Sequence, residues 1–359
     1  MFKSKLNEIT PYTPGRSIES IKKDYGLTDI IKLASNENPL GPAVDFATVS
    51  NNIELYPDYT THPFIGELSK HLNVTNQQLI LGNGSDEILQ IIALALISPG
   101  DEILSSSCTF SEYKFVAQIT DATYVEAAME NHTYNVNNLI NAMTPKTKII
   151  FIANPNNPTG TMLTHTDIEQ LMAATSPDTL VVLDEAYAEY VTNPTYPKSI
   201  ELIDKYPNLL VTRTFSKIYG LAALRIGYGM AQAHIIEGLQ KVRQPFNVNG
   251  LALDCALKAL QNQSFVKQSI QTNNEGKAFL SNELNTIDCI IPPSEGNFLY
   301  VEFKDIDGIQ LCENLLERGI IIRSMKSFGQ NNAIRVTIGT LEQNQRFIKE
   351  LHACLKKQS

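Results

Sequence analysis

Short apolar runs, each ending in a polar or glycine-rich cluster, recur along the first two thirds of the chain with helical patterns between them. Five of these runs predict buried strands, at 78–81, 102–105, 148–153, 179–183 and 209–211. Strands that alternate with helices predict a mainly parallel, doubly wound α/β sheet with a layer of helices on each face. Ligands bind such sheets at the edge where the carboxyl ends of the strands lie. The clusters that follow the strands are therefore the candidate functional residues.

The first cluster has the sequence Gly-Asn-Gly-Ser-Asp-Glu at 82–87 and precedes a helix expected at 88–97. We expect this helix to be buried because it is apolar nearly all round. Ser85 is expected to cap its N-terminus, where free backbone amides and the helix dipole attract anions. A dinucleotide site is excluded because Glu87 stands where a third glycine would be required. The candidates for an anion site are Gly84, Ser85 and Asp86, and an ordinary capped helix is the alternative interpretation.

The next two clusters supply an aromatic ring and several amides. Phe110 follows the strand at 102–105 and could cover a planar ring by offset stacking. Tyr113 is the second choice for this role, and core packing would explain either residue. The run Asn-Pro-Asn-Asn-Pro-Thr-Gly at 154–160 follows the next strand and holds more asparagine than a turn requires. Its Asn157 is the candidate ligand-binding amide.

The last two clusters carry charges at the ends of apolar strands. Asp184 ends one of them, where a carboxylate is unfavourable unless a cation pairs with it, so Asp184 is a functional candidate. Lys217 follows Ser216 beyond the final strand, and Arg225 lies eight residues later. A lysine that forms a Schiff base must lose its proton, which desolvation or a cationic neighbour such as Arg225 favours. A solvated loop lysine is the alternative.

Ser216-Lys217 followed by Arg225, together with the Asn-Pro-Asn-Asn-Pro-Thr-Gly run, resembles the motifs of pyridoxal-phosphate-dependent aminotransferases of the aspartate aminotransferase fold. The resemblance implies the three-layer sheet of fold type I with a smaller α+β domain. It also implies that Lys217 binds pyridoxal 5′-phosphate covalently and moves the proton at the substrate Cα. Asp184 would pair with the pyridine nitrogen of the cofactor.

The same resemblance implies the remaining cofactor contacts. Tyr187 and Asn157 would bind the ring oxygen, with Tyr187 counted among the catalytic residues, and Phe110 would stack on the ring. The implied phosphate ligands are the amides of Ser85 and Asp86, the side chains of Ser216 and Arg225, and Tyr56 of a neighbouring subunit. A ligand from a neighbour makes the active unit at least a homodimer.

A finer resemblance, to the histidinol-phosphate aminotransferases of this family, rests on the segments 11–16, 36–41, 84–87, 322–323 and 334–337. It implies exchange of an amino group between L-histidinol phosphate and 2-oxoglutarate in histidine biosynthesis, with glutamate as one product. The implied substrate-binding residues are Tyr12, Asn36, Asn157, Arg323 and Arg335. Aromatic-amino-acid aminotransferases and a threonine-phosphate decarboxylase have similar motifs and remain alternatives.

The 359 residues are enough for two domains. We expect an N-terminal arm at 1–35 that packs with the small domain, a large cofactor-binding domain at 36–245 and a small α+β domain at 246–359. In the last part the pattern predicts helices between about 249 and 284, strands at 297–303, 319–323 and 333–340, and a closing helix.

Composition excludes several other classes of protein. The net charge is −9 and the basic residues are scattered, so no footprint for nucleic acid or an anionic membrane is present. The five cysteines are far apart and lack Cys-x-x-Cys pairs, which argues against disulfides and zinc. No apolar run approaches the roughly 18 residues of a membrane span, and residues 1–7 lack the apolar core of a signal peptide. We expect a cytoplasmic protein that binds small molecules and no metal.

Overall fold

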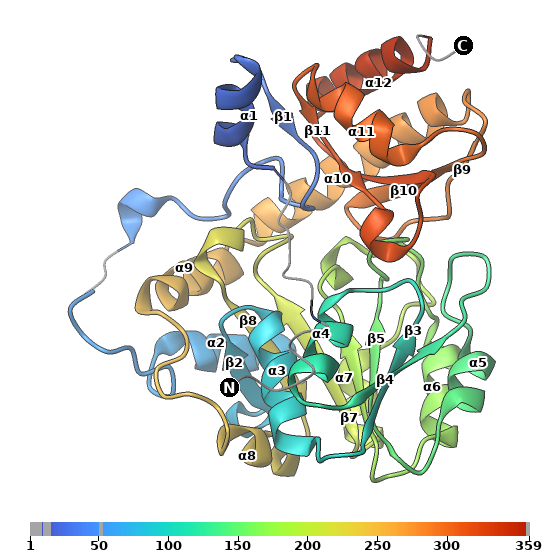
Figure 1. Ribbon diagram of the computed structural model, residues 1–359. Helices are drawn as coiled ribbons and strands as arrows, with labels where there is room; N and C mark the ends of the chain where they lie inside the picture. The colour runs from blue at the N-terminus through green and yellow to red at the C-terminus, as the bar shows by residue number, and fades with distance from the viewer. Residues whose placement is uncertain (1–8, 10–15, 50–52, 357–359) are drawn as a thin grey trace, which may run out of the picture.

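The computed structural model describes residues 9, 16–49 and 53–356. Figure 1 shows a larger body, built around a long twisted sheet, below a smaller body formed mostly by the last part of the chain. Tyr12, expected in the substrate site, lies outside the described residues.

The large sheet has seven strands in the order β2-β8-β7-β6-β5-β3-β4. Their bounds are Leu79–Gly82 (β2), Gly227–Ala231 (β8), Leu209–Thr214 (β7), Leu180–Asp184 (β6), Thr147–Ala153 (β5), Glu102–Ser106 (β3) and Thr123–Ala127 (β4). β8 is antiparallel to both neighbours, and the other neighbouring pairs are parallel. The mainly parallel sheet and its five predicted strands are confirmed, whereas β4 and β8 were not predicted. The carboxyl ends of those five strands lie at one edge of the sheet.

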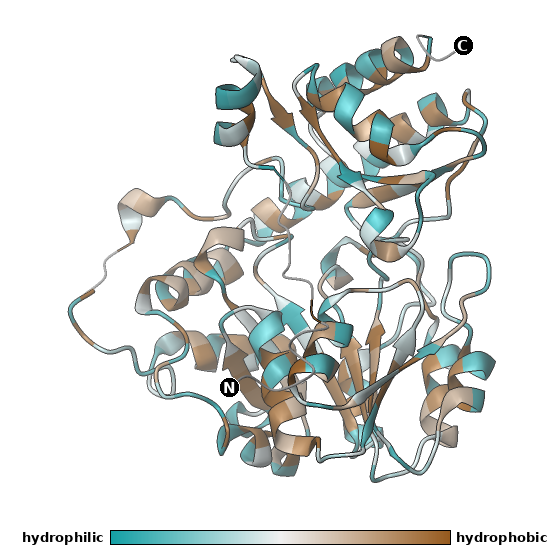
Figure 2. Cartoon of the chain, in the orientation of Figure 1, coloured by the Kyte–Doolittle hydropathy of each residue, from teal (hydrophilic) through white to brown (hydrophobic). Residues whose placement is uncertain are grey.

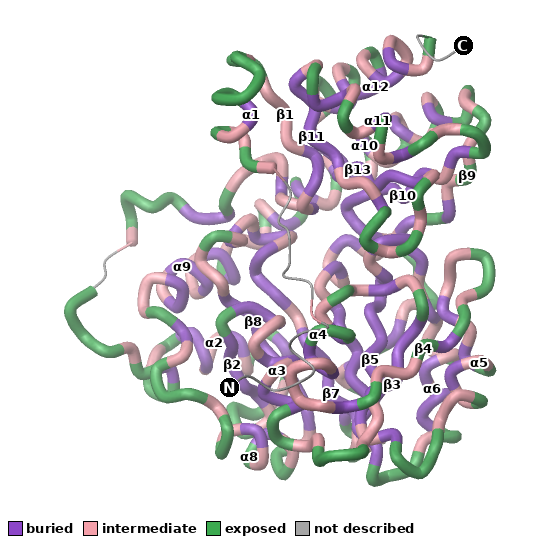
Figure 3. Tube along the Cα trace, in the orientation of Figure 1, coloured by how far each residue is buried: buried purple, intermediate pink, exposed green. Residues whose placement is uncertain are grey.

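Alternating side chains bury the two faces of this sheet against separate helical layers. In β5, Ile150 and Ile152 belong to one core, and Ile149 and Phe151 belong to the other. The first core also contains side chains of α2 (Pro63–Leu72), α5 (Val136–Ala142), α6 (His165–Ala174), α7 (Ser199–Lys205) and α9 (Gly250–Gln261). The second contains side chains of α3 (Ser85–Leu96), α4 (Glu112–Ile119) and α8 (Ala233–Gln240). Figure 2 shows the apolar strands between these layers, and Figure 3 shows that they are buried.

The smaller body holds a second, antiparallel sheet in the order β12-β13-β10-β9. Its strands are Arg323–Ser324 (β12), Ala333–Thr337 (β13), Phe298–Phe303 (β10) and Cys289–Ile290 (β9). It shares a core with helices α10 (Gln263–Leu284), α11 (Gly308–Leu316) and α12 (Leu341–Leu355). Helix α1 (Ile18–Tyr25) and strand β1 (Ile31–Lys32) lie beside it, and β1 pairs in parallel with β11 (Ile320–Ile321). The segment near the N-terminus therefore packs with the end of the chain.

The boundaries predicted for the domains remain a prediction, and one helix bears on them. Helix α9 follows residue 245, yet its buried side chains, such as Leu253 and Ala256, belong to the core of the seven-stranded sheet. Judged by the core that each side chain joins, the chain crosses to the smaller body within α10. Val266 of this helix belongs to the first core of the large sheet, and Leu280 belongs to the core of the smaller body.

Three local expectations were wrong. The strand expected at 319–323 is two short strands, because β11 pairs with β1 while β12 pairs with β13. Helix α3 is capped by Gly84, with φ of +82°, and Ser85 is its first residue. A positive φ favours glycine, which explains why the serine does not take the cap position. Helix α3 is also buried on one side only, since Leu94 is 62% exposed.

Short 3-10 turns complete the described chain: η2 (Phe46–Thr48), η3 (Asn76–Gln78), η4 (Ala188–Tyr190), η5 (Ala222–Leu224) and η6 (Lys326–Phe328). Among the described residues, no helix is long and apolar enough to cross a membrane.

Candidate active site

A cavity of about 290 Å³ opens at the sheet edge where the five predicted strands end. Residues after each of those strands contribute to its wall. Those predicted from the sequence are Ser85, Asp86, Phe110, Asn157, Asp184, Tyr187, Ser216, Lys217 and Arg225. The fold therefore brings together side chains that are separated by up to about 140 positions in the sequence, as the Arg225–Asp86 pair shows with a separation of 139.

Asp184, the last residue of β6, is a buried carboxylate in the cavity wall and is 4% exposed. Its Oδ2 accepts a hydrogen bond from the Tyr113 hydroxyl at 2.9 Å, and its Oδ1 accepts one from Thr212 Oγ1 at 3.1 Å. Burial raises the pKa of Asp184 to about 6, although both hydrogen bonds oppose the rise. Among the described residues no lysine, arginine or histidine forms an ion pair with it. A cationic partner is the group that this carboxylate lacks.

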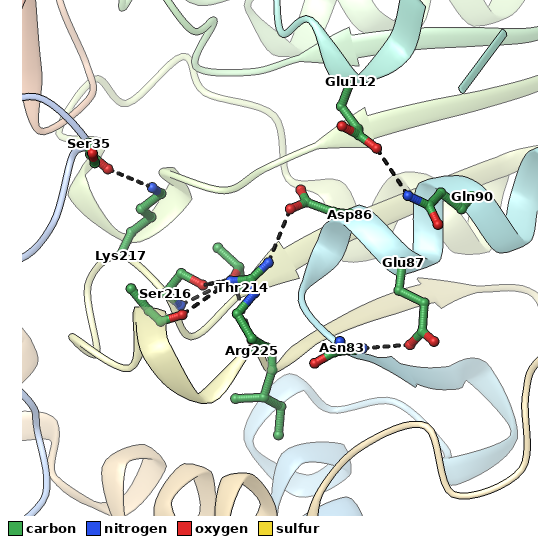
Figure 4. Close-up of polar contacts among 12 residues, drawn as sticks. Ser35, Asn83, Asp86, Glu87, Gln90, Glu112, Thr214, Ser216, Lys217 and Arg225 are labelled. Atoms are coloured by element: carbon green, nitrogen blue, oxygen red, sulfur yellow. Dashed lines mark hydrogen bonds and ion pairs between the residues drawn. The ribbon is translucent and has the colours of Figure 1, made fainter. Parts of the chain in front are cut away.

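Lys217 reaches the cavity from the loop after β7. The neighbouring Phe215, Ile218 and Leu221 are all buried, so the loop is anchored in the core while the lysine faces the opening. Lys217 Nζ donates to the carbonyl oxygen of Ser35 at 3.1 Å and lies 5.8 Å from the centre of the Tyr187 ring. Figure 4 shows the lysine pointing toward Ser35. Its amine is positioned to react with a ligand in the cavity.

Arg225 forms the cationic end of the cavity together with the start of α3. Its guanidinium donates to Asp86 Oδ2 at 3.1 Å and to Ser216 Oγ at 3.3 Å (Figure 4). It also donates to the Ala222 carbonyl at 3.2 Å. Arg225 has a φ of +54°, which is unfavourable for a non-glycine residue and must be held by the surrounding structure. Gly84 has a positive φ, which favours glycine, and a Cβ there would lie 2.5 Å from this guanidinium. Helix amides, a hydroxyl and a guanidinium are groups that bind anions in proteins.

A second cavity of about 140 Å³ adjoins the first and shares Ser35, Phe110, Asn157, Tyr187 and Lys217 with it. The additional residues in its wall are Ala34, Asn36, Ser111, Arg323, Phe328 and Arg335. Both arginines predicted to bind substrate therefore face the lysine across one space.

Arg335 is held rigidly although it sits in a strand of the smaller body. It is 7% exposed, its Nη1 donates to Asn157 Oδ1, and its Nη2 donates to the Ala34 carbonyl at 2.8 Å. Its guanidinium lies 5.3 Å from the centre of the Phe298 ring. Arg335 thus joins the Asn-Pro-Asn-Asn-Pro-Thr-Gly loop to the segment before Asn36.

Asn36 fixes that segment from the other side. It has a φ of +56° and is buried, with its backbone amide donating to Thr337 Oγ1 at 2.9 Å. Its side-chain amide donates to the Tyr187 hydroxyl at 2.9 Å, and its carbonyl accepts from Asn297 at 3.0 Å. Asn36 therefore orients Tyr187 and ties the loop to the second sheet.

Tyr56 does not lie in the cavity of its own chain. It is 83% exposed, and its ring stacks on Phe246 with 4.8 Å between ring centres. The cavity walls also contain residues that were not among the predicted site residues, namely Ala34, Ser35, Glu37, Ser111, Ala153, Pro155, Ala186, Thr214, Ala222 and Phe328. Thr214, at the end of β7, could have been found by extending the strand. Phe328 has no motif around it.

Among the described residues, no group of histidines, cysteines or acids could hold a metal ion. The residues present fit pyridoxal phosphate instead. The cavity offers a lysine for an aldehyde, a buried carboxylate without a cationic partner for a ring nitrogen, and an arginine at a helix N-terminus for a phosphate.

The fold and this arrangement define an aminotransferase of the pyridoxal-phosphate-dependent class. The model of the family "Aminotransferase class I and II" matches residues 28–351, so the chain belongs to this family. Within it, the chain is 42% identical to histidinol-phosphate aminotransferase of Moorella thermoacetica over 97% of this chain and 91% of the relative. It is 40% identical to the enzyme of the same name from Geobacillus sp., over 99% and 98%.

Solved structures agree on the fold. Histidinol-phosphate aminotransferase from Sinorhizobium meliloti, in complex with pyridoxal-5′-phosphate, superimposes with a TM-score of 0.90 at 22% identity and covers 100% of this chain and 98% of that one. L-threonine-O-3-phosphate decarboxylase from Porphyromonas gingivalis gives 0.78 at 24% identity, over 91% and 100%. The fold alone therefore does not choose between these two activities.

Proposed function

We propose that the protein transfers an amino group between L-histidinol phosphate and 2-oxoglutarate, producing imidazole-acetol phosphate and L-glutamate in histidine biosynthesis. One observation carries the proposal: Lys217, Asp184 and Arg225 face a single cavity that opens into a pocket with two arginines. Relatives named for this activity, about 40% identical over nearly the whole chain, support it.

The residues of the first cavity would hold pyridoxal phosphate. When bound, the cofactor supplies a ring that accepts the electron pair left when the substrate Cα loses its proton. Lys217 would hold the cofactor and then carry the proton at Cα, while Asp184 would keep the ring nitrogen protonated. The other proposed contacts are Asn157 and Tyr187 at the ring oxygen, Phe110 on the ring, and Gly84, Ser85, Asp86, Ser216 and Arg225 around the phosphate.

The second cavity suits substrates with an anionic end. The two half-reactions require a phosphate dianion in one case and a carboxylate in the other. The planar fork of arginine binds either anion with two parallel hydrogen bonds. Arg335 and Arg323 lie in one pocket with Lys217 and are the proposed anion ligands.

The test compares kcat/KM for histidinol phosphate, phosphate-free histidinol, phenylalanine and tyrosine, each with 2-oxoglutarate. We expect a strong preference for histidinol phosphate, because a buried guanidinium left without its anion is costly. Equal or better use of phenylalanine would make the protein an aromatic-amino-acid aminotransferase. Release of carbon dioxide from threonine phosphate would make it a decarboxylase.

We also propose a homodimer located in the cytoplasm. Large apolar side chains are exposed on both sides of residues 50–52, namely Phe46, Ile53, Leu55 and Tyr56. This part of the chain extends from the left side of the molecule in Figure 1, where a second copy could cover it and receive Tyr56 at its phosphate site. All five cysteines are free, as expected in a reducing compartment.

A further inference from the structure

A buried tyrosine contacts two of the residues that would touch the cofactor ring, Asp184 and Phe110. Tyr113, on α4, is fully buried, and its hydroxyl donates to Asp184 Oδ2 at 2.9 Å. Its ring lies edge-on to Phe110, with 5.7 Å between centres, and stacks on Phe151 at 4.8 Å. We propose that Tyr113 is a positioning residue that fixes the Asp184 carboxylate for the ring nitrogen and braces Phe110. This inference rests on the proposed function.

The packing around Tyr113 accounts for its aromatic ring but not for its hydroxyl. The ring sits among apolar neighbours of the second core, including Val116 and Ala117, where phenylalanine would fill nearly the same space. A buried hydroxyl is unfavourable unless it forms a hydrogen bond, and the partner that this one has is Asp184. The hydroxyl of Tyr113 is therefore explained by its hydrogen bond to Asp184 and is not needed to fill the core.

A second donor holds the carboxylate from the opposite side. Thr212, fully buried on β7, donates from Oγ1 to Asp184 Oδ1 at 3.1 Å. One donor on a helix and one on the neighbouring strand restrict the rotation of the Asp184 side chain. Partners of this kind, which orient the group that binds a cofactor, strongly influence affinity and activity.

The electrostatics give the direction of the expected effect. Burial raises the pKa of Asp184, with smaller increases from the charges of Asp86 and Glu185, whereas the hydrogen bonds from Tyr113 and Thr212 lower it. Burial raises the pKa of Tyr113 well above its ordinary value, so its phenol remains a donor. Loss of the Tyr113 hydroxyl would therefore raise the pKa of Asp184 further. A protonated Asp184 no longer pairs with a protonated ring nitrogen.

The experiment measures the dissociation constant of pyridoxal phosphate and kcat as functions of pH in Tyr113→Phe and Thr212→Val. We expect Tyr113→Phe to weaken cofactor binding about ten-fold near neutral pH and to move the acidic limb of both profiles to higher pH. Thr212→Val should act in the same direction and carries the test if Tyr113→Phe does not fold. Tyr228→Phe is the matched control, since Tyr228 is equally buried but belongs to the core on the other face of the sheet.

A double-mutant cycle separates positioning from general packing. If Tyr113 acts through Asp184, then Tyr113→Phe should change cofactor affinity much less in an Asp184→Asn background. Additive effects, or unshifted pH profiles in both single variants, would overturn the inference. A wild-type protein that binds no pyridoxal phosphate would instead overturn the proposed function.

Discussion

The two ends of the site are built in different ways. The cofactor end stands on one sheet, with Asp184 at the end of β6 and Lys217 just after β7. The substrate end is assembled from distant segments, since Asn36 contacts Thr337 across 301 positions in the sequence. The first end stands mainly on the seven-stranded sheet, with Ser35 and Glu37 of the N-terminal segment in its wall, whereas the second also requires Arg323 and Arg335 from strands β12 and β13 of the smaller body.

Arg335 shows what this difference means for function. It joins the two ends by donating to Asn157, in the loop after β5 of the large sheet, and to Ala34 of the N-terminal segment. A residue that holds the pocket together and also faces its ligand cannot be changed without affecting both. We therefore expect a substitution of Arg335 to change both ligand binding and the packing of the pocket.

The largest effect is expected at Lys217, whose side chain lines both cavities. Lys217→Ala removes the amine that would hold the cofactor and carry the proton, so turnover should fall by roughly four orders of magnitude or more. Borohydride should no longer attach the cofactor to the protein, as checked by mass spectrometry of the intact chain.

A lysine outside both cavities provides the control for this variant. Lys277, on α10, donates to the Ser294 carbonyl at 2.7 Å and is also partly buried. Lys277→Met should retain both activity and borohydride-dependent attachment. Cofactor attachment that persists in Lys217→Ala would remove Lys217 from its assigned role.

The cofactor end was more predictable from the sequence than the substrate end, for a physical reason. Asp184 ends an apolar strand, and Lys217 and Asn157 come shortly after the ends of two others, so strand position alone places them at one sheet edge. The Tyr113–Asp184 hydrogen bond spans 71 positions and depends on how α4 packs, which no local pattern reveals. The Gly84 cap depends on a positive φ, and Phe328 reaches the pocket only through tertiary packing.

A substitution of Asp184 is expected to lower activity and to raise the stability of the cofactor-free protein. Asp184→Asn should lower kcat/KM roughly 10²- to 10³-fold, as the loss of a key electrostatic group does in other enzymes. The same change should stabilise the cofactor-free protein above pH 6. The pKa of Asp184 is raised from 3.8 to about 6, so the folded state holds its proton more tightly than the unfolded chain does.

Because the pKa of Asp184 is higher in the folded protein than in the unfolded chain, stability decreases as pH rises. The free energy of unfolding falls as pH rises from about 4 to 6, by roughly 3 kcal/mol in total, because the unfolded chain releases the proton first. Asparagine does not ionise, so Asp184→Asn does not lose this stability as pH rises. In urea unfolding of the cofactor-free proteins, the free energy of unfolding of Asp184→Asn should therefore exceed that of the wild type by roughly this amount at neutral pH. Below about pH 4 the two proteins should be equally stable. Equal stability at neutral pH would contradict the burial argument.

The third prediction compares the two arginines of the substrate end. Arg335→Ala should lower kcat/KM about ten- to a hundred-fold in both half-reactions, because it removes a charge-assisted ligand and also frees Asn157 and Ala34. Arg335→Lys should rescue little, since an ammonium lacks the planar fork. Arg323→Ala should mainly remove the preference for histidinol phosphate over phosphate-free histidinol.

Single-turnover measurements with glutamate and with histidinol phosphate show which half-reaction is impaired in Arg335→Ala and in Arg323→Ala. Cofactor affinity should remain unchanged in Arg323→Ala, since Arg323 lines only the second cavity. A loss confined to the glutamate half-reaction in that variant would assign Arg323 to the carboxylate and leave the phosphate to Arg335.

The smallest effect is expected at Tyr56, and it tests whether the cofactor end is complete within one chain. Tyr56 is highly exposed and stacks on Phe246, outside both cavities of its own chain. If it binds the phosphate of a neighbour's cofactor, Tyr56→Phe should weaken cofactor binding several-fold, the contribution of one hydrogen bond to a charged group. The decisive measurement mixes subunits that carry Tyr56→Ala with subunits that carry Lys217→Ala. A hybrid dimer has one site with both residues intact, so activity above that of either parent is expected, whereas hybrids shown to form without any gain would return Tyr56 to the surface of its own chain.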